Sequence, residues 1–247
     1  MGHQMTHGQT THGFQFQPEA IRDLPTTYYS ENSGVGLTLL NHPKREEGLR
    51  VGALGLGIGV IASYGQADDT FRFYEINPDV IELAAGNGRF FSFLEDSAAT
   101  IQLVAGDARV SLEQELEDGM AHNFDLLVLD TFSGDAIPLH LLTKEAFETY
   151  LKQLNADGII AVNVSNRYFN LDQAVYRIAD EFRLHTALIQ APGDGLQSYD
   201  SVWLLLTYNE DFLNTPIIAA HSTTRPPSDT QLRLWTDDFS NLLQILK

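Results

Sequence analysis

The chain has 247 residues, 43% of them hydrophobic, which is enough for one globular domain with a full core and a small appendage. It carries 33 acidic and 15 basic residues, and this formal net charge of −18 repels nucleic acids and excludes them as expected partners. The chain has no cysteine, which excludes disulfides and thiolate metal sites, and no apolar run reaches the roughly 18 to 20 residues of a membrane helix. We expect a cytoplasmic protein without a metal site.

The first part of the chain is polar. Residues 1–27 contain few apolar side chains, and the alternation in "THGFQFQ" predicts a short strand or hairpin. Long apolar runs begin only after residue 46. We therefore expect an N-terminal hairpin and closing segment over residues 1–45 and a main domain over residues 46–247.

The main domain alternates apolar, strand-like runs with amphipathic helical stretches. The predicted strands cover residues 50–55, 70–76, 100–106, 124–132, 158–165, 186–190 and 201–208. The predicted helices cover residues 59–65, 78–87, 108–117, 143–154 and 171–182, and a short capping helix is expected in the tail. Apolar strands that do not alternate, joined by helices, are typical of a doubly wound parallel sheet.

The last two predicted strands are joined differently from the others. The connection "APGDGLQSYD" is too short for a crossover helix, so these strands should form an antiparallel pair. Seven strands that end in a reversed hairpin resemble the folds that bind S-adenosylmethionine. We predict an α/β fold of the Rossmann-like class I S-adenosylmethionine-dependent methyltransferase type, with a seven-stranded, mostly parallel sheet, a terminal antiparallel hairpin and a short N-terminal β-hairpin.

A glycine-rich loop, "ALGLGIGVIASYG", follows the first strand of this sheet. In open parallel sheets the ligand lies beyond the carboxyl ends of the strands, next to this turn. Gly55, Gly57 and Gly59 have the spacing G-x-G-x-G, and Val60 stands where a dinucleotide loop needs a third small residue. The loop is therefore better suited to a nucleoside whose sulfonium or amino-acid arm passes the bare backbone than to a pyrophosphate.

Acidic residues end the next two predicted strands. Glu75 ends the second strand, twenty residues after Gly55, where a carboxylate can accept hydrogen bonds from both ribose hydroxyls. Asp107 ends the third strand, a usual place to hold the edge of an adenine base. We predict a nucleoside site formed by the glycine loop, Glu75 and Asp107; ordinary turn glycines and solvated acids are the alternative interpretation.

A second acidic pair follows the fourth strand. Asp130 lies at its carboxyl end, and Asp135 lies five residues later in a loop. Two carboxylates beside a sulfonium could orient an amine and take its proton when it attacks. The alternative is that Asp130 caps a loop and Asp135 is solvated. Nearby His140 is either a proton carrier or a surface residue, and Tyr199 with Asp200 are candidates for the substrate side.

Between about residues 7 and 165, these motifs resemble the spermidine synthase family, the polyamine aminopropyltransferases. The resemblance rests on Glu75 in "YEIN", Asp107 in "AGDAR" and the acids after the fourth strand. It implies that Asp130 is the first aspartate of the amine loop; Asp135 matches the second only loosely, because the spacing is five instead of three.

The N-terminal motifs "HGFQ" and "TTYYS" resemble the hairpin and tyrosine segment that close over the site in this family. The resemblance implies substrate contacts from Gln15 and from Tyr29 or Tyr28. The tail "WTDDFSNLLQIL" together with "GDAIPLHLLTKEAF" resembles a bacterial branch of the family that is often fused to transporter-like membrane segments. Because the chain begins at the position of the family's closing hairpin, we expect a truncated N-terminal domain or a segment of a longer protein. A homodimer is expected.

Two positions depart from the family pattern. Ile58 replaces the aspartate of the family's G-G-G-D-G-G loop, which binds the aminopropyl amine, and Asn77 replaces the aspartate of its E-I-D motif. An apolar side chain accepts no hydrogen bond from an ammonium group. Both the decarboxylated and the intact form of S-adenosylmethionine therefore remain candidates for the co-substrate.

The resemblance implies an enzyme that transfers an aminopropyl group from decarboxylated S-adenosylmethionine to an amine and releases methylthioadenosine. Two alternatives stay open. The enzyme could use intact S-adenosylmethionine, for methyl transfer or for other sulfonium chemistry such as that of a lyase or cyclase. The chain could also be a nucleoside-sensing domain without catalysis.

Overall fold

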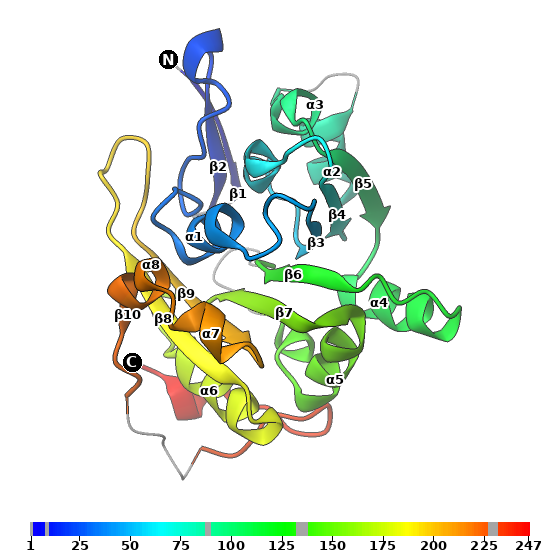
Figure 1. Ribbon diagram of the computed structural model, residues 1–247, viewed down its shortest axis with the longest axis vertical. Helices are drawn as coiled ribbons and strands as arrows, with labels where there is room; N and C mark the ends of the chain where they lie inside the picture. Colours follow the sequence, from blue (N-terminus) through cyan, green and yellow to red (C-terminus); the bar gives the residue numbers. More distant parts are fainter. Residues whose placement is uncertain (1, 8–9, 87–89, 132–137, 227–231) are drawn as a thin grey trace.

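The protein is a three-layer α/β structure in the computed structural model, with a small hairpin beside the main sheet (Figure 1). The structure describes residues 2–7, 10–86, 90–131, 138–226 and 232–247. The strand order of the main sheet is β10-β8-β9-β7-β6-β3-β4-β5. This order reverses between β3 and β6, and ligands of open α/β sheets bind at such a switch point.

The sheet combines a parallel centre with an antiparallel end, as predicted. Its parallel strands are β3 (Arg50–Leu54), β4 (Thr70–Glu75), β5 (Thr100–Ala105), β6 (Phe124–Leu129) and β7 (Leu154–Asn163). Strand β9 (Ser201–Thr207) runs antiparallel between β7 and β8 (His185–Ala191). The prediction of seven strands is short by one, because the two-residue strand β10 (Ser222–Thr223) adds to the edge at β8.

Helices cover both faces of the sheet. One face packs against α4 (Ala108–Glu117), α5 (Lys144–Gln153) and α6 (Leu171–Phe182) in a core that includes Phe147 and Trp235. The opposite face packs against α1 (Gly34–Asn41), η2 (Val60–Tyr64), α2 (Pro78–Ala85), α3 (Phe93–Asp96), α7 (Glu210–Leu213) and α8 (Pro216–His221). The central strands β3, β6 and β7 are buried on both sides, which explains why they do not alternate in the sequence, whereas the edge strand β5 is largely exposed.

Several helix starts follow from local sequence. The side chains of Asn77, Asp107 and Thr143 accept backbone N–H groups at the starts of α2, α4 and α5. The stretch after the glycine loop, predicted as a helix, is the short 3-10 helix η2, and the tail forms the 3-10 helix η4 (Leu242–Ile245). Two further 3-10 turns, η1 (Glu19–Ile21) and η3 (Leu139–Leu141), complete the elements.

The predicted N-terminal hairpin is present as β1 (Gly2–His7) and β2 (Thr10–Phe16), which stand upright beside α1 in Figure 1. Its Met5 packs with Ile58, Val60, Phe91 and Phe93 in a small apolar cluster of its own. The hairpin is thereby fixed to the loop that follows β3. None of the helices in the described ranges is long and apolar enough to span a membrane.

Candidate functional site

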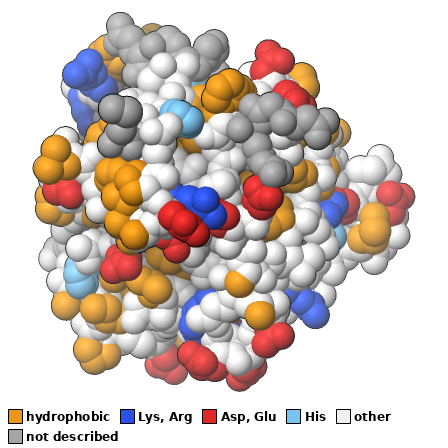
Figure 2. Space-filling view, turned by 90° about the horizontal axis from the view of Figure 1, so that it is seen from above, with side chains coloured by type: hydrophobic (Ala, Val, Ile, Leu, Met, Phe, Trp, Pro, Cys, Tyr) orange, Lys and Arg blue, Asp and Glu red, His pale blue; other side chains and the backbone are white. Residues whose placement is uncertain are grey.

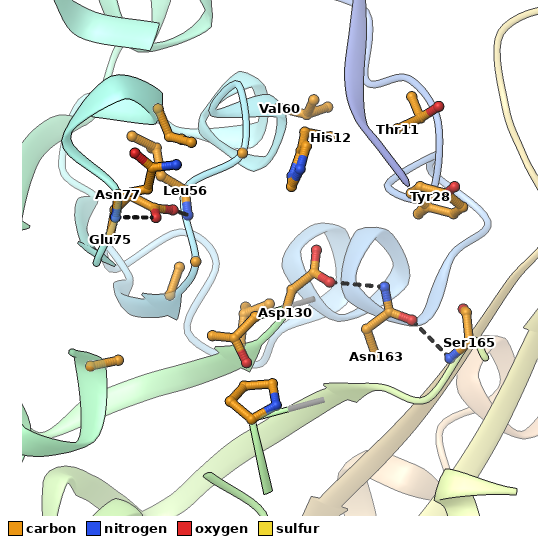
Figure 3. Close-up of a pocket in the computed structure, with 18 of the residues that line it drawn as sticks. Thr11, His12, Tyr28, Leu56, Val60, Glu75, Asn77, Asp130, Asn163 and Ser165 are labelled. Atoms are coloured by element: carbon orange, nitrogen blue, oxygen red, sulfur yellow. Dashed lines mark hydrogen bonds between the residues drawn. The ribbon is translucent and has the colours of Figure 1, made fainter. Parts of the chain in front are cut away.

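A cavity of about 1240 Å³ opens at the carboxyl ends of the central strands. Residues that follow β3, β4, β5, β6 and β7 line it, and Met5, Thr11 and His12 of the hairpin add a wall (Figure 3). The cavity therefore lies at the switch point between β3 and β6, with a second, smaller element covering part of it. Its size suits a nucleoside-sized ligand together with a small second molecule.

The glycine loop brings bare backbone to this cavity. Gly55 has φ +96°, and a Cβ at this position would lie 2.2 Å from the carbonyl oxygen of Asp130. Gly57 has φ +54°, and a Cβ there would lie 2.9 Å from the carbonyl oxygen of His12. Strands β3 and β6 and the hairpin therefore converge so closely that only glycine fits. Both glycines line the cavity.

Glu75 ends β4 and faces the cavity from the side of the glycine loop (Figure 3). Its Oε2 accepts the N–H of Leu56 at 3.0 Å, and its Oε1 accepts the N–H of Asn77 at 2.8 Å. A carboxylate oxygen has two acceptor positions, so each oxygen keeps one for a further donor. The side chain is thus oriented by backbone and can still accept a pair of hydroxyl groups. Ile76, 69% exposed, adds an apolar surface to the lining.

Asp107 lies on the same side of the cavity, after β5. Its Oδ1 accepts the N–H of Val110 at 3.0 Å, and its Oδ2 lies 2.9 Å from Nε2 of His140. Burial raises the pKa of the Asp107 carboxyl, but the Val110 N–H and His140 outweigh this effect and leave the pKa below its usual value. His140 therefore lines the cavity beside Asp107 and contacts its carboxylate.

Asp130 follows β6 and is held from two directions. Its Oδ2 accepts the Tyr29 hydroxyl at 2.5 Å. Its Oδ1 accepts a hydrogen bond from Nδ2 of Asn163 at 3.0 Å (Figure 3). Asn163 is oriented in turn, because its Oδ1 accepts the N–H of Ser165 at 3.0 Å. Burial raises the pKa of the Asp130 carboxyl, and the two hydrogen bonds only partly counteract it. The result is a fixed carboxylate with increased basicity at the cavity wall.

The tyrosine segment is positioned by the connection between β8 and β9. The N–H of Thr27 donates to Gln197 at 2.8 Å, and the N–H of Tyr199 donates back to Thr27 at 2.9 Å. The rings of Tyr28 and Tyr199 meet edge to face with centroids 5.5 Å apart. Tyr28, Tyr29, Tyr199 and Asp200 all line the cavity, so residues about 170 positions apart in sequence form one wall.

Three predicted site residues do not line the cavity. Ile58 is 1% exposed in the cluster under the hairpin, where a Cβ on Gly13 would lie 2.4 Å from its Cγ1. Gly59 is also absent from the lining; it begins η2 with φ +81°. Gln15 is buried and holds the hairpin, because its amide donates to Arg22 and Ser92 and accepts the N–H of Ser92.

Asp135 lies outside the described residues. Sequence reasoning missed Asn163, although a polar residue at the end of the apolar run "IIAVNVS" marks a strand end beside β6. Within the described ranges, no three His, Asp or Glu side chains are grouped in a way that could hold a metal ion.

The cavity is predominantly acidic. Its described lining includes five carboxylates, from Glu75, Asp79, Asp107, Asp130 and Asp200, and two basic side chains, from Arg167 and Lys247. Such a lining attracts cations, for example a sulfonium or an ammonium group. In Figure 2, a basic group in the middle of the visible face lies directly against acidic side chains, so local pairing neutralises part of the chain's positive charge.

Comparisons with known proteins agree with this geometry. No protein-family model matches the chain. A polyamine aminopropyltransferase of Vibrio vulnificus is 28% identical over 141 residues, which are 56% of this chain and 45% of the relative. An N-terminal histidine N-methyltransferase of Emericella nidulans is 29% identical over 152 residues, 60% of this chain and 26% of the relative. The chain thus spans less than half the length of these curated relatives.

Solved structures show the same fold at low sequence identity. A spermidine synthase from Thermotoga maritima superposes with a TM-score of 0.57 at 14% identity, over 92% of this chain and 72% of that chain. A probable spermidine synthase from Corynebacterium glutamicum gives 0.58 at 19% identity, over 89% and 81%. Human methyltransferase-like protein 13, in complex with SAH, gives 0.56 at 18%, over 80% and 93%. The chain therefore has the class I S-adenosylmethionine-dependent methyltransferase fold and is similar in sequence to a polyamine aminopropyltransferase.

Proposed function

We propose that the protein is a transferase that binds decarboxylated S-adenosylmethionine and transfers its aminopropyl group to an amine. One observation carries the proposal: a fixed, half-buried carboxylate, Asp130, shares one cavity with Glu75 and the bare glycine loop. The proximity of these groups to one switch point supports a site in which Glu75 anchors a nucleoside and Asp130 acts as a base for an amine. The similarity to a polyamine aminopropyltransferase adds support.

The residues present suit a nucleoside with a sulfonium group. Glu75 would accept the two ribose hydroxyls with its remaining lone pairs, and Ile76 would pack against the base. Asp107 would accept the adenine amino group on Oδ2, either beside His140 or in place of it. The acidic lining would favour the positive charge of the sulfonium and of an ammonium acceptor.

Asp130 would then orient the acceptor amine. In the proposed step the amine nitrogen forms a bond to the carbon next to sulfur, the carbon–sulfur bond breaks, and neutral methylthioadenosine leaves. The proton released by the nitrogen goes to the Asp130 carboxylate, whose raised pKa improves it as a base. Tyr29 and Asn163 hold this carboxylate in one orientation, so positioning contributes most of the rate acceleration.

The test combines the protein, decarboxylated S-adenosylmethionine and 1,4-diaminobutane, with methylthioadenosine measured by mass spectrometry. We expect product from the wild type and a loss of about 10² to 10⁴ in rate for Asp130→Asn. Asp118→Asn, at the exposed end of α4, is the control and should keep the wild-type rate. A wild-type protein that binds the donor but releases no methylthioadenosine with a panel of amines contradicts aminopropyl transfer.

Methyl transfer from intact S-adenosylmethionine is the second candidate. It is favoured by the similarity to an N-terminal histidine N-methyltransferase and by Ile58, which supplies no carboxylate for the aminopropyl ammonium and is buried away from the cavity lining. The same assay separates the two reactions, because methyl transfer releases S-adenosylhomocysteine. For either reaction we expect a cytoplasmic homodimer that acts on small molecules and not on nucleic acid, given the net charge of −18.

A further inference from the structure

Arg167 lines the acidic cavity but has no carboxylate partner within the described part of the chain. Several other arginines of this acidic protein pair closely: Arg22 with Asp96 at 2.8 Å, Arg45 with Asp69 at 2.9 Å, and Arg109 with Asp237 at 2.6 Å. Within the described residues, the exposed Arg50 and Arg183 form no ion pair either. Arg167 is itself exposed, and it differs from these two because it belongs to the lining of a cavity that also contains acids.

The turn that carries Arg167 is fixed. Oδ1 of Asn166 accepts the N–H groups of Tyr168 and Phe169, both at 2.9 Å. The Lys247 ammonium donates to the carbonyl oxygen of Asn166 at 2.7 Å, and Lys247 also lines the cavity. Arg167 therefore starts from a held backbone position, and a second positive charge lies next to the same turn.

Arg167 and Lys247 form a positively charged end of the cavity, which adjoins the proposed acceptor site. Arg167 follows Asn163, the Asp130 partner, by four residues, and Ser165 between them accepts the N–H of Val202 at 2.8 Å. Glu75 and Asp107 lie on the other side of β3, after β4 and β5. The central strands β3 and β6 therefore separate Glu75 and Asp107, the proposed nucleoside anchors, from Arg167, which follows β7.

One acid also belongs to this end of the cavity. Asp200 precedes Val202 by two residues, lines the cavity, and its Oδ1 accepts the N–H of Gly193 at 2.8 Å. An arginine and an aspartate that line one cavity without an ion pair between them suit a ligand that carries both a carboxylate and an ammonium group. A guanidinium group binds a carboxylate through two parallel N–H donors.

We propose that Arg167 binds the carboxylate of a substrate, an inference that rests on the transferase function proposed above, in either of its two candidate reactions. Two ligands could supply this carboxylate. The first is the methionine arm of intact S-adenosylmethionine, which the decarboxylated form lacks. The second is an acceptor amine that also carries a carboxylate. Both share the chemistry of an amino acid, whereas a plain diamine has no group for Arg167.

Calorimetric binding of intact and decarboxylated S-adenosylmethionine tests the first source. Arg167→Gln is compared with the control variant Arg50→Gln. Arg50 is also exposed, but it begins β3 at the amino ends of the parallel strands and does not line the cavity. If the donor supplies the carboxylate, Arg167→Gln should weaken binding of the intact form by about tenfold to a hundredfold, the effect of a charged hydrogen bond. Binding of the decarboxylated form should change less than about twofold, and Arg167→Lys should restore part of the loss.

The acceptor source is tested by steady-state kinetics with a matched pair of amines, 1,4-diaminobutane and 4-aminobutanoate. If the acceptor supplies the carboxylate, Arg167→Gln should raise KM for 4-aminobutanoate by about tenfold or more and leave KM for the diamine unchanged. Either result supports the proposal and identifies the ligand. Donor binding and turnover that respond equally to Arg167→Gln and Arg50→Gln overturn it and leave the proposed function intact. A wild type that binds neither donor overturns both.

Discussion

The hydrogen bond between Tyr29 and Asp130 joins residues 101 positions apart and can be measured as a coupling energy. Tyr29→Phe removes the hydroxyl that donates to Oδ2 and leaves the Asn163 contact in place. A hydrogen bond to a charged group contributes about 1.5 to 3 kcal/mol, so we expect a loss of that size at pH 7. With an m-value of about 3 kcal/mol per molar urea, the unfolding midpoint falls by about 0.5 to 1 M.

Asp130→Ala completes a double-mutant cycle with Tyr29→Phe. The two losses should be non-additive by about 1.5 kcal/mol or more, because each single change breaks the same contact. A coupling below about 0.5 kcal/mol would refute the geometry described for this pair. The pKa of Asp130 is raised above 3.8, so the folded state binds its proton more tightly than the unfolded state. Stability from this group therefore falls as pH rises from 3.8 through the raised pKa, and Asp130→Asn should remove that fall.

Three further predictions concern the loop, the hairpin and a turn. Gly55 has φ +96° and a Cβ there would lie 2.2 Å from backbone, so Gly55→Ala should lower the free energy of unfolding in urea by more than about 3 kcal/mol. Gly119→Ala, at φ +78° with open space around it, should lower it by about 1 kcal/mol, and equal losses would contradict the close approach at Gly55. Ile58→Asp should lower the free energy of unfolding by about 3 kcal/mol or more, because it buries a charge. Ile76 is 69% exposed, so Ile76→Asp should change thermal stability little; a mild effect at position 58 would mean that this side chain faces solvent. NMR titration of the Asp194 carboxyl should give a pKa of about 2, lowered from 3.8 by the N–H groups of its own turn. The stabilising effect of this carboxylate should disappear as pH falls from about 4 towards 2, and a midpoint near 3.8 would show that the turn does not hold it.

Much of the fold follows from local patterns in the sequence. Apolar runs without alternation predict strands buried on both faces, and short polar caps such as Asn77, Asp107 and Thr143 mark helix starts. The positions of Glu75 and Asp130 at strand ends also follow, because the carboxyl ends of parallel strands meet at one edge of the sheet. These features depend on neighbours within a few residues, so the sequence by itself determines them.

Contacts between distant segments were decided only by the tertiary structure. The sequence places Ile58 among glycines of a ligand loop, yet the positive φ values around it turn its side chain under the hairpin and away from the cavity lining. The partners of Asp130, Tyr29 and Asn163, come from other elements, and so does the contact of His140 with Asp107. Side-chain direction and pairing across a sheet depend on packing and register, which residue spacing along the chain does not encode.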